Sequence, residues 1–171
     1  MKKYFVTAAV SIVIIFVLSN MSYQQQSIIP LLETYLANKP FEETLRPIKF
    51  TYWEQIISID TRGYFHFMEF LFRKSAHFLG YGFVGVIFYG VYRHLRWQVP
   101  AIFASLTVFI IACLDEYRQS LSPDRTGIFQ DVLLDTAGAI FCISIFASFL
   151  LLLRGTTKVK MKSKNHKNGI Y

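Results

Sequence analysis

The sequence predicts an all-α polytopic membrane protein with four transmembrane helices, and three observations lead to this fold class. Hydrophobic residues make up 53% of the 171 residues and charged residues only 17%, too few to coat a water-soluble domain of this size. The apolar residues fall in four nearly uncharged stretches, each close to the length that crosses a bilayer. The stretches are continuous, which predicts helices, because an isolated strand cannot satisfy its backbone in lipid.

The four predicted spans cover about residues 4–20, 75–92, 98–114 and 132–153. The first span has two interpretations. Lys2 and Lys3 ahead of an apolar run are also typical of a secretory signal peptide. No small-x-small cleavage site follows the run, which favours a retained membrane anchor over a cleaved leader.

The distribution of positive charge predicts the orientation. With the amino terminus inside, ten of the eighteen Lys and Arg residues lie on three short cytoplasmic segments, as the positive-inside rule requires. Both termini are therefore expected in the cytoplasm, and residues 154–171 are expected to form a basic, disordered tail. Because this tail follows directly on a membrane helix, the net charge of +7 predicts contact with anionic lipid and excludes a nucleic-acid partner.

The long outer loop, about residues 21–73, is expected to hold structure of its own. Three prolines divide it, and two segments between them, 29–36 and 50–59, carry apolar residues at helical spacing. Two short amphipathic helices on the outer leaflet are the predicted structure, with the prolines ending them.

The second membrane helix is expected to begin before the bilayer. From Tyr64 onward, the pattern predicts a helix that starts in water and then enters the membrane. Glu69 and Arg73 lie four residues apart in the order that favours an ion pair on one helix face.

Three of the predicted helices carry polar residues that membrane helices normally lack. Spacings of three and four residues place them on one face of each helix, and all lie at the same depth, just inside the outer surface. An ionisable group inside a membrane costs roughly 2.5–3.5 kcal/mol. These groups are therefore expected to meet in one hydrated pocket. The predicted site consists of Lys74, His77, Tyr81, Asp115, Glu116, Gln119, Arg125, Asp131 and Asp135.

The residue types in this set suit several kinds of chemistry. His77 can act as a general base near neutral pH, and Lys74 with Arg125 can hold a phosphate or carboxylate. The carboxylates can act as acids or bind a divalent cation through oxygen. Structural roles compete with these. A buried histidine often serves only as a hydrogen-bonding group, and Asp131 near a helix start can offset the helix dipole.

Four short blocks of this sequence, in order, resemble the VanZ-like family. They are Arg73-Lys-Ser-Ala-His-Phe-x-x-Tyr81, Asp115-Glu-x-x-Gln119, Pro123-Asp-Arg125 and Asp131-Val-x-x-Asp-Thr-x-Gly138. The resemblance extends to about Leu153. Members often carry Asn at the position of Asp135 and Gly at that of Asp124. The added charge at Asp135 therefore favours a cation partner or a protonated side chain.

This resemblance implies a four-helix protein of the bacterial cytoplasmic membrane, in a family whose founding member is associated with teicoplanin resistance. Two functions are compatible with the polar cluster. The first is an enzyme that acts at the outer leaflet on a membrane lipid or a lipid-linked envelope intermediate. The second is a non-catalytic protein that binds a lipid or lipopeptide head group and limits its access to a target.

Overall fold

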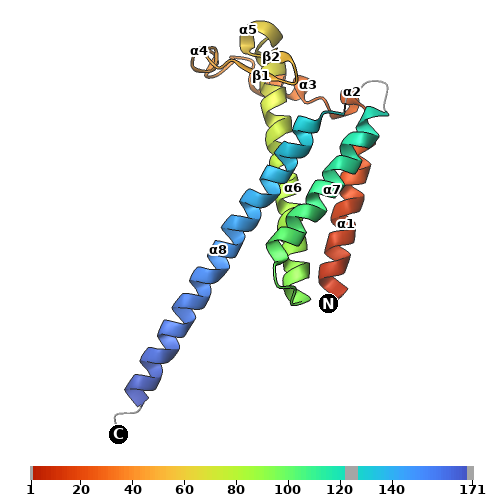
Figure 1. Cartoon of the computed structure of the whole chain (residues 1–171). Helices are drawn as coiled ribbons and strands as arrows, with labels where there is room; N and C mark the ends of the chain where they lie inside the picture. The colour runs from red at the N-terminus through yellow and green to blue at the C-terminus, as the bar shows by residue number, and fades with distance from the viewer. Residues whose placement is uncertain (1, 122–126, 169–171) are drawn as a thin grey trace.

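The chain folds almost entirely into helices (Figure 1). The computed structural model describes residues 2–121 and 127–168. The four long helices are α1 (Lys2–Ser19), α6 (Tyr64–His94), α7 (Pro100–Ser120) and α8 (Phe129–Asn168). The predicted all-α membrane fold is confirmed, apart from one short β-hairpin.

Three helices of the described chain are long and apolar enough to cross a membrane by themselves: α6, α7 and the part of α8 from Phe129 to Leu153. The first apolar stretch qualifies only if Phe5–Ser19 and Tyr23–Tyr35, bent by 119° at a short break, form one span. The prediction of four spans is therefore confirmed for three. The bend lies at Ser22, where a capping box starts a new helix immediately after α1 ends.

The helices extend beyond the ends that hydropathy gives them. Helix α6 already begins at Tyr64, as the sequence pattern predicted, and α7 continues through its polar residues to Ser120. The polar residues near these ends contact neighbouring helices, so hydropathy alone places the start of α6 too late and the end of α7 too early. Helix α8 continues through the basic segment to Asn168, where the sequence predicted a disordered tail.

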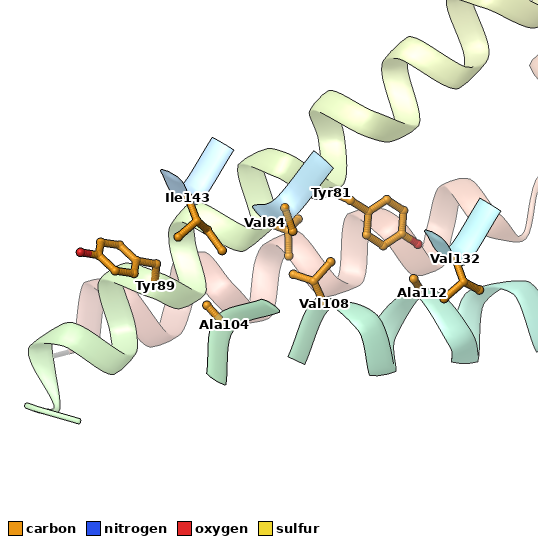
Figure 2. Close-up of a cluster of buried hydrophobic side chains, with 9 residues drawn as sticks. Tyr81, Val84, Tyr89, Ala104, Val108, Ala112, Val132 and Ile143 are labelled. Atoms are coloured by element: carbon orange, nitrogen blue, oxygen red, sulfur yellow. The ribbon is translucent and has the colours of Figure 1, made fainter. Parts of the chain in front are cut away.

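Helix α6 is the centre of the bundle, because it packs against α8, α7 and α1. Figure 2 shows the small and branched side chains that fill the α6–α7–α8 interface, among them Val84, Val108 and Ala112. On the α8 side, Gly138 lies so close to α6 that a Cβ atom there would overlap the carbonyl oxygen of Phe78. This close approach brings the polar stripes of α6 and α8 into contact.

The segment between α1 and α6 folds into short elements that gather at the end of the bundle away from the start of α1 (Figure 1). They are α2 (Tyr23–Gln26), α3 (Ile29–Tyr35), α4 (Glu42–Leu45), β1 (Phe50–Tyr52), β2 (Gln55–Ile57) and α5 (Ile59–Arg62). The helix predicted over 29–36 is confirmed as α3. The helix predicted over 50–59 is wrong.

Residues 50–57 form an antiparallel hairpin because of the turn at their centre and because Ile57 is buried against α6. Phe50 pairs with Ile57 and Tyr52 with Gln55, so Trp53 and Glu54 form a two-residue turn. Both turn residues have positive φ, 47° and 57°, as in the turns that match strand twist. Ile57 is fully buried in a cluster with residues of α6, and this contact outweighs the helical spacing of its apolar neighbours.

Replacing Glu54 with Gly should stabilise the hairpin. Glu54 occupies the left-handed region at φ 57°, where a side chain costs about 1 kcal/mol and glycine costs little. We expect amide hydrogens of residues 50–57 to exchange about fivefold more slowly in the variant. Exchange at α3, measured in the same experiment, is the internal control. Faster exchange in the hairpin would contradict the assigned turn.

Candidate functional site

The polar residues of α6, α7 and α8 meet in layers beneath the hairpin. In the layer nearest the hairpin, the Lys74 ammonium and the Tyr52 hydroxyl both donate to Oδ1 of Asp131. Lys74 also lies 4.8 Å from the centre of the Tyr52 ring. Burial and the hydrogen bond to Asp131 raise the pKa of Tyr52, so its hydroxyl stays protonated as a donor. The hairpin is thus joined to α6 and α8 through one carboxylate.

One helical turn deeper, His77 of α6 faces Asp135 of α8. His77 Nδ1 lies 3.6 Å from Asp135 Oδ1, and the Asp135 side chain is 0% exposed. Neither carboxylate oxygen of Asp135, nor Nδ1 of His77, has a hydrogen-bond partner within the described chain. A wholly buried carboxylate without a donor is rare, because burying an unpaired polar group is costly.

One further turn along α6, a third polar group lies between α6 and α7. Tyr81 Oη donates to Asp115 Oδ2 at 3.0 Å, and Gln119 Nε2 donates to the same oxygen at 2.8 Å. The His77 and Tyr81 rings stack with centroids 6.1 Å apart. Because its stacking partner is itself hydrogen-bonded, the imidazole is held in orientation from one side.

Glu116 points to a different place from the other predicted residues. Its Oε2 accepts the backbone N–H of Ile128 at 2.8 Å, just ahead of α8, while its Oε1 is buried and has no partner among the residues described. Gly127 packs so tightly on α7 that a Cβ atom would overlap the carbonyl oxygen of Glu116. Glu116 therefore fixes the start of α8. Arg125, also a predicted site residue, lies outside the described residues.

A cavity of about 230 Å³ lies between the hairpin and the upper layer. Three predicted residues line it: Lys74, Gln119 and Asp131. It is also lined by ionisable residues that the sequence did not assign to the site, namely Arg62, His66, Glu69 and Arg73. The interpretation of residues 21–73 as an outer loop of mixed charge hid them. The spacing of three and four residues from His66 through Glu69 to Arg73 could have indicated a shared face.

Glu69 is bound differently from the prediction. Its carboxylate, 1% exposed, accepts hydrogen bonds from Tyr23 Oη at 2.6 Å, Ser27 Oγ at 2.7 Å and the Ile28 backbone N–H at 2.9 Å. The expected Glu69–Arg73 ion pair does not form, and the Arg73 guanidinium lies over the Tyr23 ring at 4.8 Å. The ion pair is replaced because α2 and the start of α3 fold back against α6 and supply three closer donors to Glu69.

The positions of the acidic side chains determine whether they can bind the divalent cation that the sequence allowed. Among the residues that the structure describes, no three His, Cys, Asp or Glu side chains lie close enough together to hold a metal ion. Asp115 and Asp131 each accept two hydrogen bonds, and Asp135 faces His77. These three carboxylates therefore face separate partners and do not converge on one point.

Comparison with known proteins places the chain in a family. No curated protein and no solved structure matches it. The family model described as VanZ/LLP1 matches residues 4–152, which include all of the layered polar residues and the cavity. The match covers most of the chain and agrees with the resemblance of the four sequence blocks. The chain therefore belongs to the VanZ/LLP1 family.

Proposed function

We propose that this protein acts on the head group of an amphiphile, such as a lipid-linked envelope intermediate, at the outer surface of the bacterial cytoplasmic membrane. Both termini lie in the cytoplasm in this arrangement, as the positive-inside rule predicts. The head group occupies the cavity beneath the hairpin, and His77 with Asp135 transfers a proton to or from it.

The observation that carries this proposal is the buried carboxylate of Asp135. It is wholly inaccessible and 3.6 Å from His77 Nδ1, and neither oxygen has a hydrogen-bond partner among the residues that the structure describes. A carboxylate with only a structural role would be expected to accept hydrogen bonds, because a buried carboxylate without a donor destabilises the fold. Ionisable groups held in unfavourable surroundings of this kind are typical of catalytic and binding sites.

The geometry assigns a role to each member of the pair. His77 presents Nδ1 to Asp135, which leaves Nε2 as the nitrogen that can take a proton from a hydroxyl group or water. Asp135 orients the imidazole and stabilises its protonated form, and the 3.6 Å separation is of the kind that shortens when a substrate binds. His77 lies one turn below Lys74, which lines the cavity. Neither His77 nor Asp135 lines the cavity itself, so in this proposal the head group extends one helical turn below the cavity to reach Nε2.

The test is His77→Gln and Asp135→Asn in the purified full-length protein, reconstituted in bilayers and incubated with bacterial lipid extracts. Mass spectrometry follows both bound and altered lipids. We expect either variant to lower turnover by about 10²-fold or more, the usual contribution of general acid–base catalysis, and to leave binding intact. His94→Gln, at the opposite end of α6, is the matched control with unchanged turnover.

A wild-type protein that binds an amphiphile but alters none would overturn the catalytic proposal in favour of head-group capture. The family resemblance also leads to a test in cells, in which the contribution of the protein to teicoplanin resistance is measured. In a susceptible bacterium, enzymatic action requires that His77→Gln abolish any increase in teicoplanin resistance. Capture requires the increase to persist.

A further inference from the structure

The cationic side chains around the cavity differ in how they are neutralised. Lys74 is paired with Asp131. Arg62 and Arg73 form no ion pair with any residue in the described part of the chain. Each guanidinium lies over an aromatic ring instead, Arg62 over Phe70 at 5.5 Å and Arg73 over Tyr23 at 4.8 Å.

The two carboxylates of the cavity lining already accept hydrogen bonds from donors other than the arginines. Glu69 accepts three hydrogen bonds from α2 and the start of α3, and Asp131 accepts from Lys74 and Tyr52. The lining thus holds three cations against two carboxylates, and the unpaired charge belongs to the arginines.

A cation–π contact leaves the N–H donors of a guanidinium available, because an aromatic ring accepts no conventional hydrogen bond. Arg62 uses one donor on the Gln55 side chain at 2.5 Å, and its other donors remain. Both guanidinium groups line the cavity, which therefore presents positively charged N–H donors that no carboxylate of the described residues binds in an ion pair.

We propose that Arg62 and Arg73 bind a terminal phosphate group, so that the ligand of this site is an amphiphile with a phosphomonoester head group. This inference rests on the proposed function for the amphiphile and adds the class of head group. A phosphomonoester carries about −1.5 to −2 charge and three acceptor oxygens, which matches two guanidinium groups. A carboxylate offers only two acceptor oxygens, enough for one guanidinium fork, whereas three phosphate oxygens can accept from both arginines.

The size of the cavity agrees with a head group. At about 230 Å³ it is smaller than the roughly 300–1,000 Å³ of pockets that enclose whole drug-sized ligands. The phosphate and its nearest substituents fit within it, and acyl chains must remain outside. Helix α6 continues from this cavity into its membrane-spanning part, so the chains can lie beside it in lipid.

The experiment measures binding of short-chain phosphatidic acid to the purified full-length protein in detergent, at one fixed salt concentration. Phosphatidylcholine and a fatty acid of equal chain length are the comparison ligands. We expect phosphatidic acid to bind most tightly, and Arg62→Gln or Arg73→Gln each to weaken it about tenfold, since a charge-assisted hydrogen bond is lost. Arg62→Lys and Arg73→Lys keep the charge but lose the fork, and should weaken binding about threefold.

Arg46→Gln is the matched control. Arg46 lies in the same outer segment but outside the cavity, in ion pairs with Glu42 and Asp60. We expect its loss to change binding by less than about twofold, because exposed pairs contribute little. Equal losses for Arg46→Gln and Arg73→Gln, or unchanged binding in both cavity variants, would overturn the phosphate site. Thermal unfolding of each variant shows that the fold is retained.

Two further measurements distinguish a lipid ligand from free phosphate, and failure of the phosphate site from failure of the catalytic proposal. Inorganic phosphate that competes only weakly supports a lipid ligand, whereas equal affinity for inorganic phosphate would overturn the amphiphile as its source. His77→Gln should bind phosphatidic acid as tightly as the wild type. If the wild type binds it but alters no phosphate amphiphile, the phosphate site stands and the catalytic proposal fails. If turnover depends on His77 but substitution of Arg62 or of Arg73 leaves phosphatidic acid binding unchanged, the phosphate site is wrong and the catalytic proposal stands.

Discussion

Gly138→Ala is expected to lower the thermal unfolding midpoint by about 5–10 °C. The added Cβ atom would overlap the carbonyl oxygen of Phe78, which belongs to the α6 backbone and cannot rotate away. Overpacking costs about 1–3 kcal/mol, and a clash with backbone lies at the upper end. For a chain of this size, each kcal/mol corresponds to about 2–4 °C. The measurement is unfolding of the purified protein in detergent.

Gly80→Ala is the matched control for this change. Gly80 also lies within a membrane-spanning helix, but a Cβ atom there would meet nothing within 4 Å. Because alanine favours helix over glycine by about 1 kcal/mol, this variant should be as stable as the wild type or slightly more so. Equal destabilisation by the two substitutions would show that α6 and α8 do not pack at the distance described here.

Glu69→Ala is expected to release α2 and α3 from the bundle. Three donors lose their shared buried acceptor, and hydrogen bonds to a charged group contribute about 1.5–3 kcal/mol each. Water can hydrate some of the donors left without an acceptor, because Tyr23 lies at the surface. The net loss in the free energy that holds this segment on the bundle should therefore be about 3 kcal/mol. We expect amide hydrogens of residues 23–35 to exchange about 10²-fold faster, since local opening sets their rate.

Glu33→Gln controls for the loss of one negative charge from the same segment. Glu33 is exposed on α3, so its variant should exchange like the wild type. Amide exchange in the parts of α6 and α8 farthest from the hairpin should be unaffected in both variants. If Glu69→Ala leaves residues 23–35 protected, the hydrogen bonds to Tyr23, Ser27 and Ile28 do not hold this segment in place.

These two sites explain how the fold positions the candidate chemistry. The close approach at Gly138 sets the distance between α6 and α8, across which His77 meets Asp135 and Lys74 meets Asp131. Glu69 holds the segment that supplies Tyr23 to the cavity wall. The layered polar groups therefore depend on contacts that are themselves outside the proposed reaction.

The sequence by itself determined the membrane-helix class and much of the candidate polar cluster. Long apolar stretches specify helices in lipid, where the backbone must satisfy itself locally. Helical periodicity is likewise local, so spacings of three and four residues suffice to place Lys74, His77 and Tyr81 on one face. The cost of isolated charges in a membrane then predicts that the facing carboxylates lie nearby.

Only the tertiary structure decided which partners meet and how the outer segment folds. The burial of Ile57 against α6 and the turn at Trp53 and Glu54 produce a hairpin where the local spacing predicted a helix. Arg62 and Arg73 became cavity residues because the chain between α1 and α6 folds back over them. Contacts between residues far apart in the sequence depend on packing and competing donors, which periodicity and composition do not encode.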